Sequence, residues 1–201
     1  MEQDLIKRVQ AITNGGELYY DYNEEIDLAR DYSFKICRQY NDLVQHQNEY
    51  HYELLAGLFA HLGKNVRIEA NFLTEFGFNL SVGDNVTILQ DVSLIDCTLV
   101  TIGNNVVIGP HCGIYTANHA EDPKLRANHY CYERPIVIED DVVIGGGSVI
   151  APGVKIGAGS IVQAGSVVVK DLPANSFCLG DPCQAIRKLR EDQWRKDGAS
   201  S

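Results

Sequence analysis

The chain has 201 residues, of which 45% are apolar, and a formal net charge of −10. This length predicts one domain of ordinary size, and the acidic balance excludes nucleic acid as a main partner because phosphate backbones are bound by basic surfaces. No apolar run approaches the roughly 18 residues of a membrane span, and the acidic first residues lack a signal-peptide pattern, so we expect a soluble cytoplasmic protein with no membrane partner.

Residues 1–65 are expected to form a small helical cap. Apolar side chains recur there at helical spacing in three groups. Asn14-Gly15-Gly16 is expected to stop the first helix, and Gly63 to close the third. The three groups are Leu5, Ile6 and Val9; then Leu28, Tyr32, Ile36, Tyr40 and Leu43; and finally Leu54, Leu55, Leu58, Phe59 and Leu62.

From about residue 66 to residue 182, aliphatic side chains recur every six residues. A period of six fits neither a helix nor a simple strand alternation. It predicts a β-solenoid in which three hexads complete one triangular coil, so that every eighteenth residue stacks on itself. The period slips by two residues after Leu94 and is interrupted after Ile114. The periodic residues are Val82, Ile88, Leu94, Ile102, Ile108, Ile114, Ile138, Ile144, Ile150, Ile156, Val162 and Val168.

The interruption, at about residues 115–135, has the polar and aromatic composition of an excursion loop. Insertions in repeat proteins become loops on one face and often carry function. His119 lies where the coil gives way to this loop. A neutral imidazole can remove the proton of an attacking hydroxyl near neutral pH, which makes His119 the candidate general base.

The six cysteines are scattered and none forms a Cys-x-x-Cys pair. This spacing gives little support to a zinc or redox site. We therefore expect small buried thiols inside the coil.

Several motifs resemble the hexapeptide-repeat acyltransferases, and more closely their maltose and galactoside O-acetyltransferase subfamily. The resemblance covers nearly the whole chain and implies a left-handed parallel β-helix, an exception to the usual right-handed crossover. A short C-terminal tail or helix is expected over residues 183–201. The matching stretches are residues 102–110 and 144–157 of the coil, Gly16-Glu17-Leu18-Tyr19 followed by Asp21, Val169-Lys170-Asp171-Leu172-Pro173, and Gly180-Asp181-Pro182-Cys183.

The resemblance implies an acetyl-CoA-dependent O-acetyltransferase. His119 ends a Tyr-Thr-x-x-His motif that matches the family's catalytic histidine, although Ala120 replaces the usual proline. The family binds coenzyme A in a groove between neighbouring subunits of a homotrimer. Two departures, Val143 for a tryptophan and Gln184 for an arginine, would weaken particular contacts. The residues expected to line that groove are Gly146, Ala164, Val169, Lys170 and Arg187.

The same resemblance implies an acceptor site made of Asp21, Glu75, Leu89 and Cys97. Asp21 matches the family, and Glu75 keeps a polar side chain. Leu89 replaces an asparagine, however, and Cys97 replaces an acidic residue. Because an unpaired buried hydrogen-bonding group costs about 1–3 kcal/mol, we expect an acceptor that is less polar than a hexose at this point or bound in another pose.

Three alternatives stay open at this stage. One is acetylation of a xenobiotic or antibiotic, and another is a non-catalytic solenoid that serves as an assembly module. The third is a three-histidine metal site of His111, His119 and His129, as in carbonic anhydrases built on the same coil. Their spacing of eight and ten residues does not reproduce that arrangement, so we expect no metal.

Overall fold

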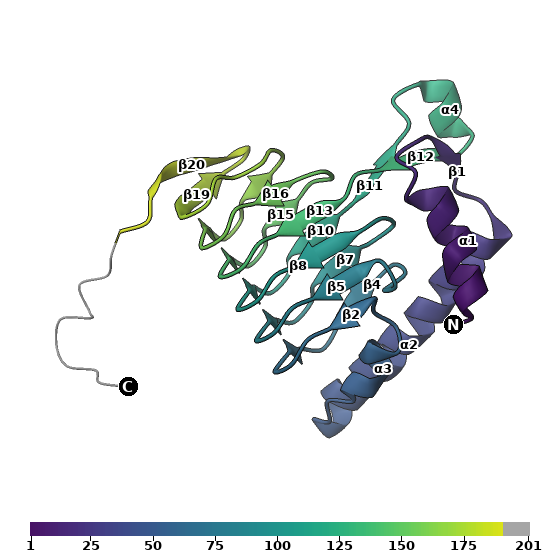
Figure 1. Ribbon diagram of the computed structural model, residues 1–201, viewed down its shortest axis with the longest axis horizontal. Coiled ribbons are helices and arrows are strands. Elements are labelled where there is room, and N and C mark those ends of the chain that lie inside the picture. The colour runs from purple at the N-terminus through teal and green to yellow at the C-terminus, as the bar shows by residue number, and fades with distance from the viewer. Residues whose placement is uncertain (191–201) are drawn as a thin grey trace.

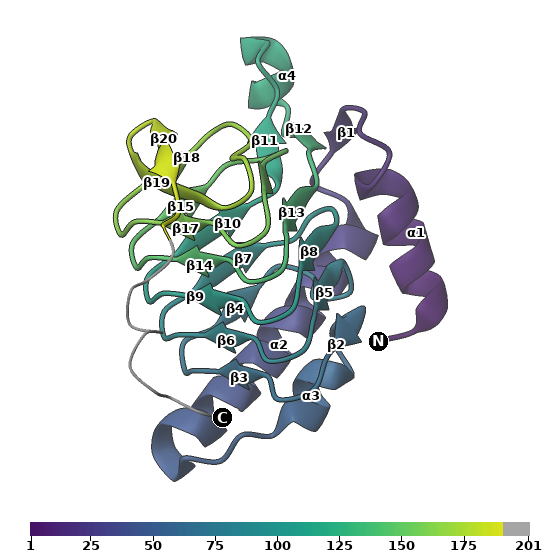
Figure 2. The ribbon, with the colours of Figure 1, turned by 60° about the vertical axis from the view of Figure 1, so that its left-hand side comes forward.

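The computed structural model describes residues 1–190 as a left-handed parallel β-helix with helices along one flank (Figure 1). The N-terminal part contains three helices and a short strand. Figures 1 and 2 place α1 and α2 side by side, in agreement with their packing contacts. These elements are α1 (Gln3–Thr13), β1 (Tyr19–Tyr20), α2 (Glu24–Gln47) and α3 (Tyr52–Ala56).

Helix α2 begins and ends at residues suited to those positions. The side chain of Asn23 accepts hydrogen bonds from the backbone N–H groups of Glu25 and Ile26, and Asn48 ends the helix in the left-handed conformation. Its buried face matches the predicted one only in part. Tyr40 is buried, and Tyr32 and Ile36 pack against the core, but Leu28 is exposed. The buried residues of the helix are Ile26, Ala29, Ser33, Cys37, Tyr40 and Val44.

The coil has three parallel sheets, which form its three faces. The first face contains β2 (His61–Leu62), β5 (Leu80–Val82), β8 (Val100–Ile102), β13 (Ile136–Ile138) and β16 (Lys155–Ile156). The second contains β3 (Arg67–Ile68), β6 (Thr87–Ile88), β9 (Val107–Ile108), β14 (Val143–Ile144), β17 (Ile161–Val162), β19 (Ser176–Gly180) and the antiparallel β20 (Cys183–Lys188). The third contains β4 (Leu73–Thr74), β7 (Ser93–Ile95), β10 (Gly113–Tyr115), β15 (Val149–Ile150) and β18 (Val167–Val168).

The six-residue period is confirmed, because all twelve periodic aliphatic residues are buried in one continuous core cluster. They stack in columns on the three faces. Ile102, Ile138 and Ile156, for example, are register partners on the first face. Each side chain therefore removes apolar surface from water together with its neighbours above and below.

The expected repeat of eighteen residues holds only in the C-terminal coils. Ile138 pairs with Ile156, eighteen residues on, whereas Leu94 pairs with Ile114, twenty residues on. The two additional residues lie between the third and first faces, where residues 75–79 and 96–99 make wide turns. The excursion at residues 116–135 leaves from the same corner one coil later. We call this edge of the coil the loop corner.

Another corner of the coil, between the first and second faces, is held by a ladder of amide side chains. Asn65, Asn85, Asn105 and Asp141 all adopt positive φ angles, which asparagine and aspartate tolerate better than most residues. Each amide donates a hydrogen bond to the residue in the next coil, over 2.9–3.1 Å. These bonds satisfy polar groups that tight turns expose.

Both ends of the coil differ from the sequence-based expectation. Leu62, predicted to end the third helix, lies in β2, so the coil begins before residue 66. At the C-terminal end, residues 183–188 form β20 instead of a helix, because they pair back on β19. The rest of the expected tail, from residue 191 onward, lies outside the described residues. Over residues 1–190, no helix is both long and apolar enough to cross a membrane.

Candidate active site

The excursion loop folds back as a small sheet beside the loop corner. It contains β11 (Ala117–His119), α4 (Pro123–Ala127) and β12 (Tyr130–Glu133), and Figure 1 shows it projecting beyond the coil. Asp122 begins α4 by accepting hydrogen bonds from the N–H groups of Lys124 and Leu125. Strand β12 is central, with β11 on one side and β1 of the N-terminal part on the other. The loop is therefore anchored by a segment about 110 residues earlier in the chain.

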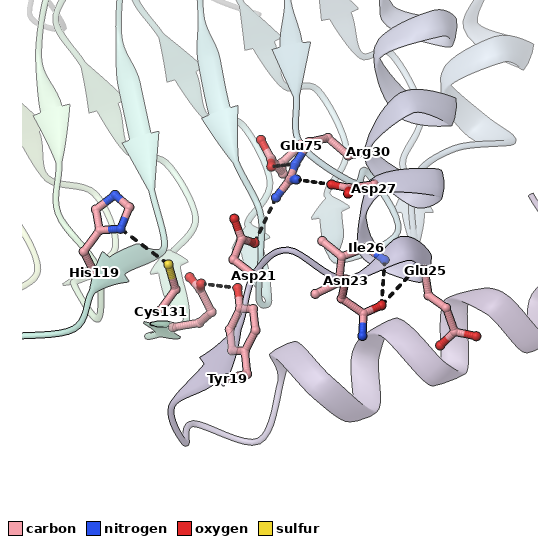
Figure 3. A network of polar contacts seen from close by, with 11 residues as sticks. Tyr19, Asp21, Asn23, Glu25, Ile26, Asp27, Arg30, Glu75, His119 and Cys131 are labelled. Atoms are coloured by element: carbon pink, nitrogen blue, oxygen red, sulfur yellow. Dashed lines mark hydrogen bonds and ion pairs between the residues drawn. The ribbon is translucent and has the colours of Figure 1, made fainter. Parts of the chain in front are cut away.

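His119 is exposed at the end of β11, directly opposite Cys131 of β12. Its Nδ1 atom lies 3.5 Å from the sulfur of Cys131. In Figure 3 the ring meets the sulfur through this nitrogen, and the other ring nitrogen points away from the contact. Within residues 1–190 the Nε2 atom has no hydrogen-bond partner, so it is the ring nitrogen available to meet a reacting group.

Asp21 and Glu75 are brought together by Arg30, a residue that the sequence reasoning missed. The Arg30 guanidinium donates to Asp21 over 3.0 Å, to Asp27 over 2.9 Å and, through Nε, to Glu75 (Figure 3). Burial lowers the pKa of Arg30, but the charges of Glu75 and Asp21 outweigh that effect and raise it. The sequence shows that Arg30 follows the apolar Ile26 by four residues, but only the structure shows that Ile26, and not Leu28, lies on the buried face of α2.

Glu133 is a second functional candidate that sequence reasoning did not find. It is buried on the same face of β12 as Cys131, and the Tyr19 hydroxyl donates a 2.6 Å hydrogen bond to its Oε1 atom. Its Oε2 atom has no partner among the described residues. Burial, together with the nearby charges of Asp21 and Glu75, raises the pKa of Glu133 to about 7.

Cys97 lies in an apolar cluster between the helices and the loop corner. It is buried, and its pKa is raised well above the ordinary value by desolvation and by the charges of Glu133 and Glu75. The preceding residue, Asp96, is also buried. It accepts hydrogen bonds from the Thr74 hydroxyl and the Phe76 N–H, which hold the neighbouring wide turn in place.

Within one chain, Leu89 lies apart from Asp21, Glu75 and Cys97, the other residues expected at the acceptor site. It follows β6 and lies at a different corner, between the second and third faces, made by residues 89–92, 109–112, 145–148 and 163–166. We call this edge the glycine corner. Gly146 and Ala164 lie there too, eighteen residues apart in successive coils.

The other residues expected to contact coenzyme A lie elsewhere. Val169 and Lys170 are exposed and follow β18 at the loop corner, the same corner from which the His119 excursion leaves. Arg187 lies on β20, with its guanidinium 4.4 Å from the centre of the Phe177 ring. Within one chain, the residues expected to contact coenzyme A are therefore split among the glycine corner, the loop corner and β20.

The three histidines considered for a metal site have separate surroundings. His111 lies at the glycine corner, 3.6 Å from an Asp91 oxygen. His129 stacks on the ring of Tyr22, with the ring centres 3.9 Å apart. Within residues 1–190, no three His, Cys, Asp or Glu side chains are grouped to hold a metal ion. All six cysteines are free and buried.

A left-handed β-helix with a histidine-bearing loop at one corner defines the class of hexapeptide-repeat acyltransferases. Family models support this assignment: the bacterial transferase hexapeptide model matches residues 135–170, and the maltose acetyltransferase hexapeptide capping motif matches residues 15–63.

Individual relatives agree with the family models. A galactoside O-acetyltransferase of Lactococcus lactis is 32% identical over 89% of this chain and 87% of its own. A maltose O-acetyltransferase structure from Clostridium difficile is 36% identical, with a TM-score of 0.85 over 90% of this chain and 96% of its own. A hexapeptide-repeat acetyltransferase from Vibrio cholerae, solved with acetyl coenzyme A, is also 36% identical, with a TM-score of 0.82 over 91% and 98%. The chain belongs to the maltose and galactoside O-acetyltransferase family, and it is an acetyltransferase.

Proposed function

We propose that this protein transfers an acetyl group from acetyl-CoA to a hydroxyl of a sugar or sugar-like small molecule, with His119 as the general base. The observation that carries the proposal is the placement of His119. It lies on the projecting loop, with its Nε2 atom free, at the corner where Asp21 and Glu75 also lie. The Vibrio cholerae relative solved with acetyl coenzyme A supports this donor.

In the proposed reaction, His119 Nε2 takes the proton of the acceptor hydroxyl as its oxygen attacks the thioester carbonyl. The C–O bond forms, the C–S bond breaks, and the departing sulfur receives the proton. General-base catalysis of this kind contributes about 10²- to 10⁴-fold in rate. No covalent acyl-enzyme is needed, and the nearest thiol, Cys131, is a poor nucleophile because burial raises its pKa to about 11.

The donor groove is proposed to form between copies of the chain in a homotrimer. The groove residues divide between the glycine corner, with Gly146 and Ala164, and the loop corner, with Val169 and Lys170. A groove that uses both sets can form where the loop corner of one copy meets the glycine corner of the next. This arrangement would also bring Leu89 of one copy toward His119 of another. Arg187 would approach the phosphates of the nucleotide end.

On the acceptor side, Asp21 and Glu75 supply carboxylates that Arg30 holds in place. Carboxylate oxygens accept hydrogen bonds from hydroxyl groups. Leu89 and buried Cys97 cannot replace the polar groups expected at their positions. We therefore propose an acceptor that is less polar than a hexose on the side that meets Leu89 and Cys97. Antibiotics that carry a hydroxyl group are the alternative acceptor class.

The test is an assay of thiol release from acetyl-CoA against a panel of maltose, galactosides, less polar glycosides and hydroxylated antibiotics. His119→Ala should lose about 10²- to 10⁴-fold in turnover while coenzyme A binding, measured by calorimetry, stays. His46→Ala, at an exposed histidine of α2, is the matched control and should keep full turnover. Unchanged turnover in His119→Ala would refute the assignment of the base. Maltose or galactosides acetylated with micromolar Michaelis constants would refute the less polar acceptor.

A further inference from the structure

His119 and Cys131 form a cross-strand pair whose side chains are set close together by the backbone. The Ala120 N–H donates to the Tyr130 carbonyl over 2.9 Å, and the Arg134 N–H donates to the Thr116 carbonyl over 3.0 Å. These bonds alternate along β11 and β12, and they place His119 and Cys131 at a non-hydrogen-bonded position. Facing side chains approach most closely at such positions. The 3.5 Å contact between Nδ1 and sulfur therefore follows from the register of the two strands.

The Cys131 thiol is enclosed on the side away from His119. Tyr19 of β1 is its register partner on the other side, and the thiol belongs to the apolar cluster between the helices and the coil. Desolvation, followed by the charges of Asp21 and Glu133, raises the pKa of Cys131 to about 11. At neutral pH the group is a neutral thiol, whose sulfur is a weak hydrogen-bond acceptor.

We propose that Cys131 is a positioning residue, whose sulfur accepts a hydrogen bond from His119 Nδ1–H and so holds Nε2 unprotonated toward the acceptor. This inference rests on the proposed role of His119 as the general base. A neutral imidazole carries its single proton on one ring nitrogen, and the hydrogen bond made by that nitrogen selects the tautomer. Only the tautomer with the proton on Nδ1 leaves a lone pair on Nε2 for the hydroxyl proton.

Because the Cys131 thiol is neutral, it affects the His119 ring differently from a charged partner. A carboxylate at the same place would stabilise the imidazolium, whereas a neutral thiol orients the ring without adding a charge. Glu133 is on the same strand face as Cys131, but its Oε1 atom is bonded to Tyr19. The Glu133 Oε2 atom has no partner among the described residues, and the atom that meets His119 Nδ1 is the sulfur of Cys131.

The test reads the tautomer directly and does not depend on activity. In protein labelled with ¹⁵N-histidine, the His119 ring signals are identified by their loss in His119→Ala. Wild type should show a protonated Nδ1 and an unprotonated Nε2. Cys131→Ala should shift the ring toward the Nε2–H tautomer and lower kcat about five- to tenfold, with the KM for acetyl-CoA unchanged. Cys131→Ser, whose hydroxyl can accept the same bond, should keep the tautomer and stay within about threefold of wild-type kcat.

Cys178→Ala is the matched control, because it removes a buried thiol from β19 and should alter neither tautomer nor turnover. An Nε2–H tautomer in wild type would overturn the proposal. So would a Cys131→Ala variant that keeps both the wild-type tautomer and the wild-type kcat. Full turnover in His119→Ala would refute the general base instead, and the tautomer of Cys131→Ala would still decide whether Cys131 positions the ring.

Discussion

The Tyr19 hydroxyl donates a 2.6 Å hydrogen bond to the buried Glu133 carboxyl and so joins the N-terminal segment to the excursion loop. Other contacts act at the same junction: β1 pairs with β12, the Asp21 N–H donates to the His129 carbonyl over 3.0 Å, and Tyr22 stacks on His129. The strand that faces His119 is thus held by a segment remote in sequence. The N-terminal segment both covers the coil and positions the loop.

Replacing Tyr19 with Phe should destabilise the protein. The substitution removes the only hydrogen bond to the Glu133 carboxyl among the described residues and leaves both oxygens of a buried group unpaired. We expect a loss of about 1–3 kcal/mol in the free energy of unfolding, measured by urea denaturation. Tyr20→Phe, at the exposed neighbour on the opposite strand face, should change it by less than about 0.5 kcal/mol. Equal effects of the two variants would contradict this role of Tyr19.

The buried Glu133 carboxyl predicts a stability that falls as pH rises. Its pKa is about 7 in the folded protein, against an ordinary value of 4.5. Between these values the folded protein keeps a proton that the unfolded chain has released. The free energy of unfolding therefore decreases from about pH 4.5 to about pH 7 and levels off above that.

Glu133→Gln removes this titration and can still accept the Tyr19 hydrogen bond. Melting temperatures measured from pH 5 to pH 8 should fall less steeply in the variant than in wild type. Some slope should remain, because burial also raises the pKa of Asp96 to about 7, which contributes with the same sign. An identical slope in the two proteins would show that Glu133 does not titrate in this range.

Arg30 should matter much more to stability than an exposed arginine with a similar ion pair. Arg30→Met leaves Asp21 and Glu75, both mostly buried, as neighbouring carboxylates without their shared cation. We expect a loss of about 2–4 kcal/mol by urea denaturation. Arg8→Met breaks the exposed Arg8–Glu25 pair and should cost less than about 1 kcal/mol. A loss below about 1 kcal/mol in Arg30→Met would mean that the two carboxylates do not depend on this cation.

The sequence carried enough information to predict the coil. A buried aliphatic residue at every sixth position is a local pattern, so residues such as Ile144 and Val162 could be assigned to its interior without knowing what they contact. The two-residue slip after Leu94 was visible too. The structural consequence of this slip could not be predicted, because only the stacking of successive coils shows that the wide turns and the excursion share the loop corner.

The candidate site was harder to predict because its contacts join distant residues. Cys131 meets His119 across a hairpin whose register depends on loop geometry. Tyr19 and Glu133 are 114 residues apart, and Arg30 and Glu75 are 45 apart. No short-range spacing encodes such pairs. Residues 183–188, expected to begin a C-terminal tail or helix, form a strand for a similar reason, since their own sequence does not reveal that β19 is available for pairing.

Mixing two inactive variants should test whether the site forms between chains. His119→Ala removes the proposed base at the loop corner. Ala164→Glu places a bulky charge at an exposed position of the glycine corner and should block the donor groove. Each variant alone should have little activity. If one site uses His119 from one copy and Ala164 from its neighbour, random co-assembly leaves about one interface in four with both residues intact.

Co-expression of the two variants under separate affinity tags, with purification through both tags, removes assemblies of a single variant. Each remaining mixed trimer has one intact interface of three and should therefore show about a third of wild-type turnover. Two copies of the same variant with the two tags provide the control and should recover none. A mixed assembly that stays inactive would indicate that His119 and Ala164 serve the same site within a single chain. That outcome would also remove the reason for placing Leu89 next to the base of a neighbouring copy.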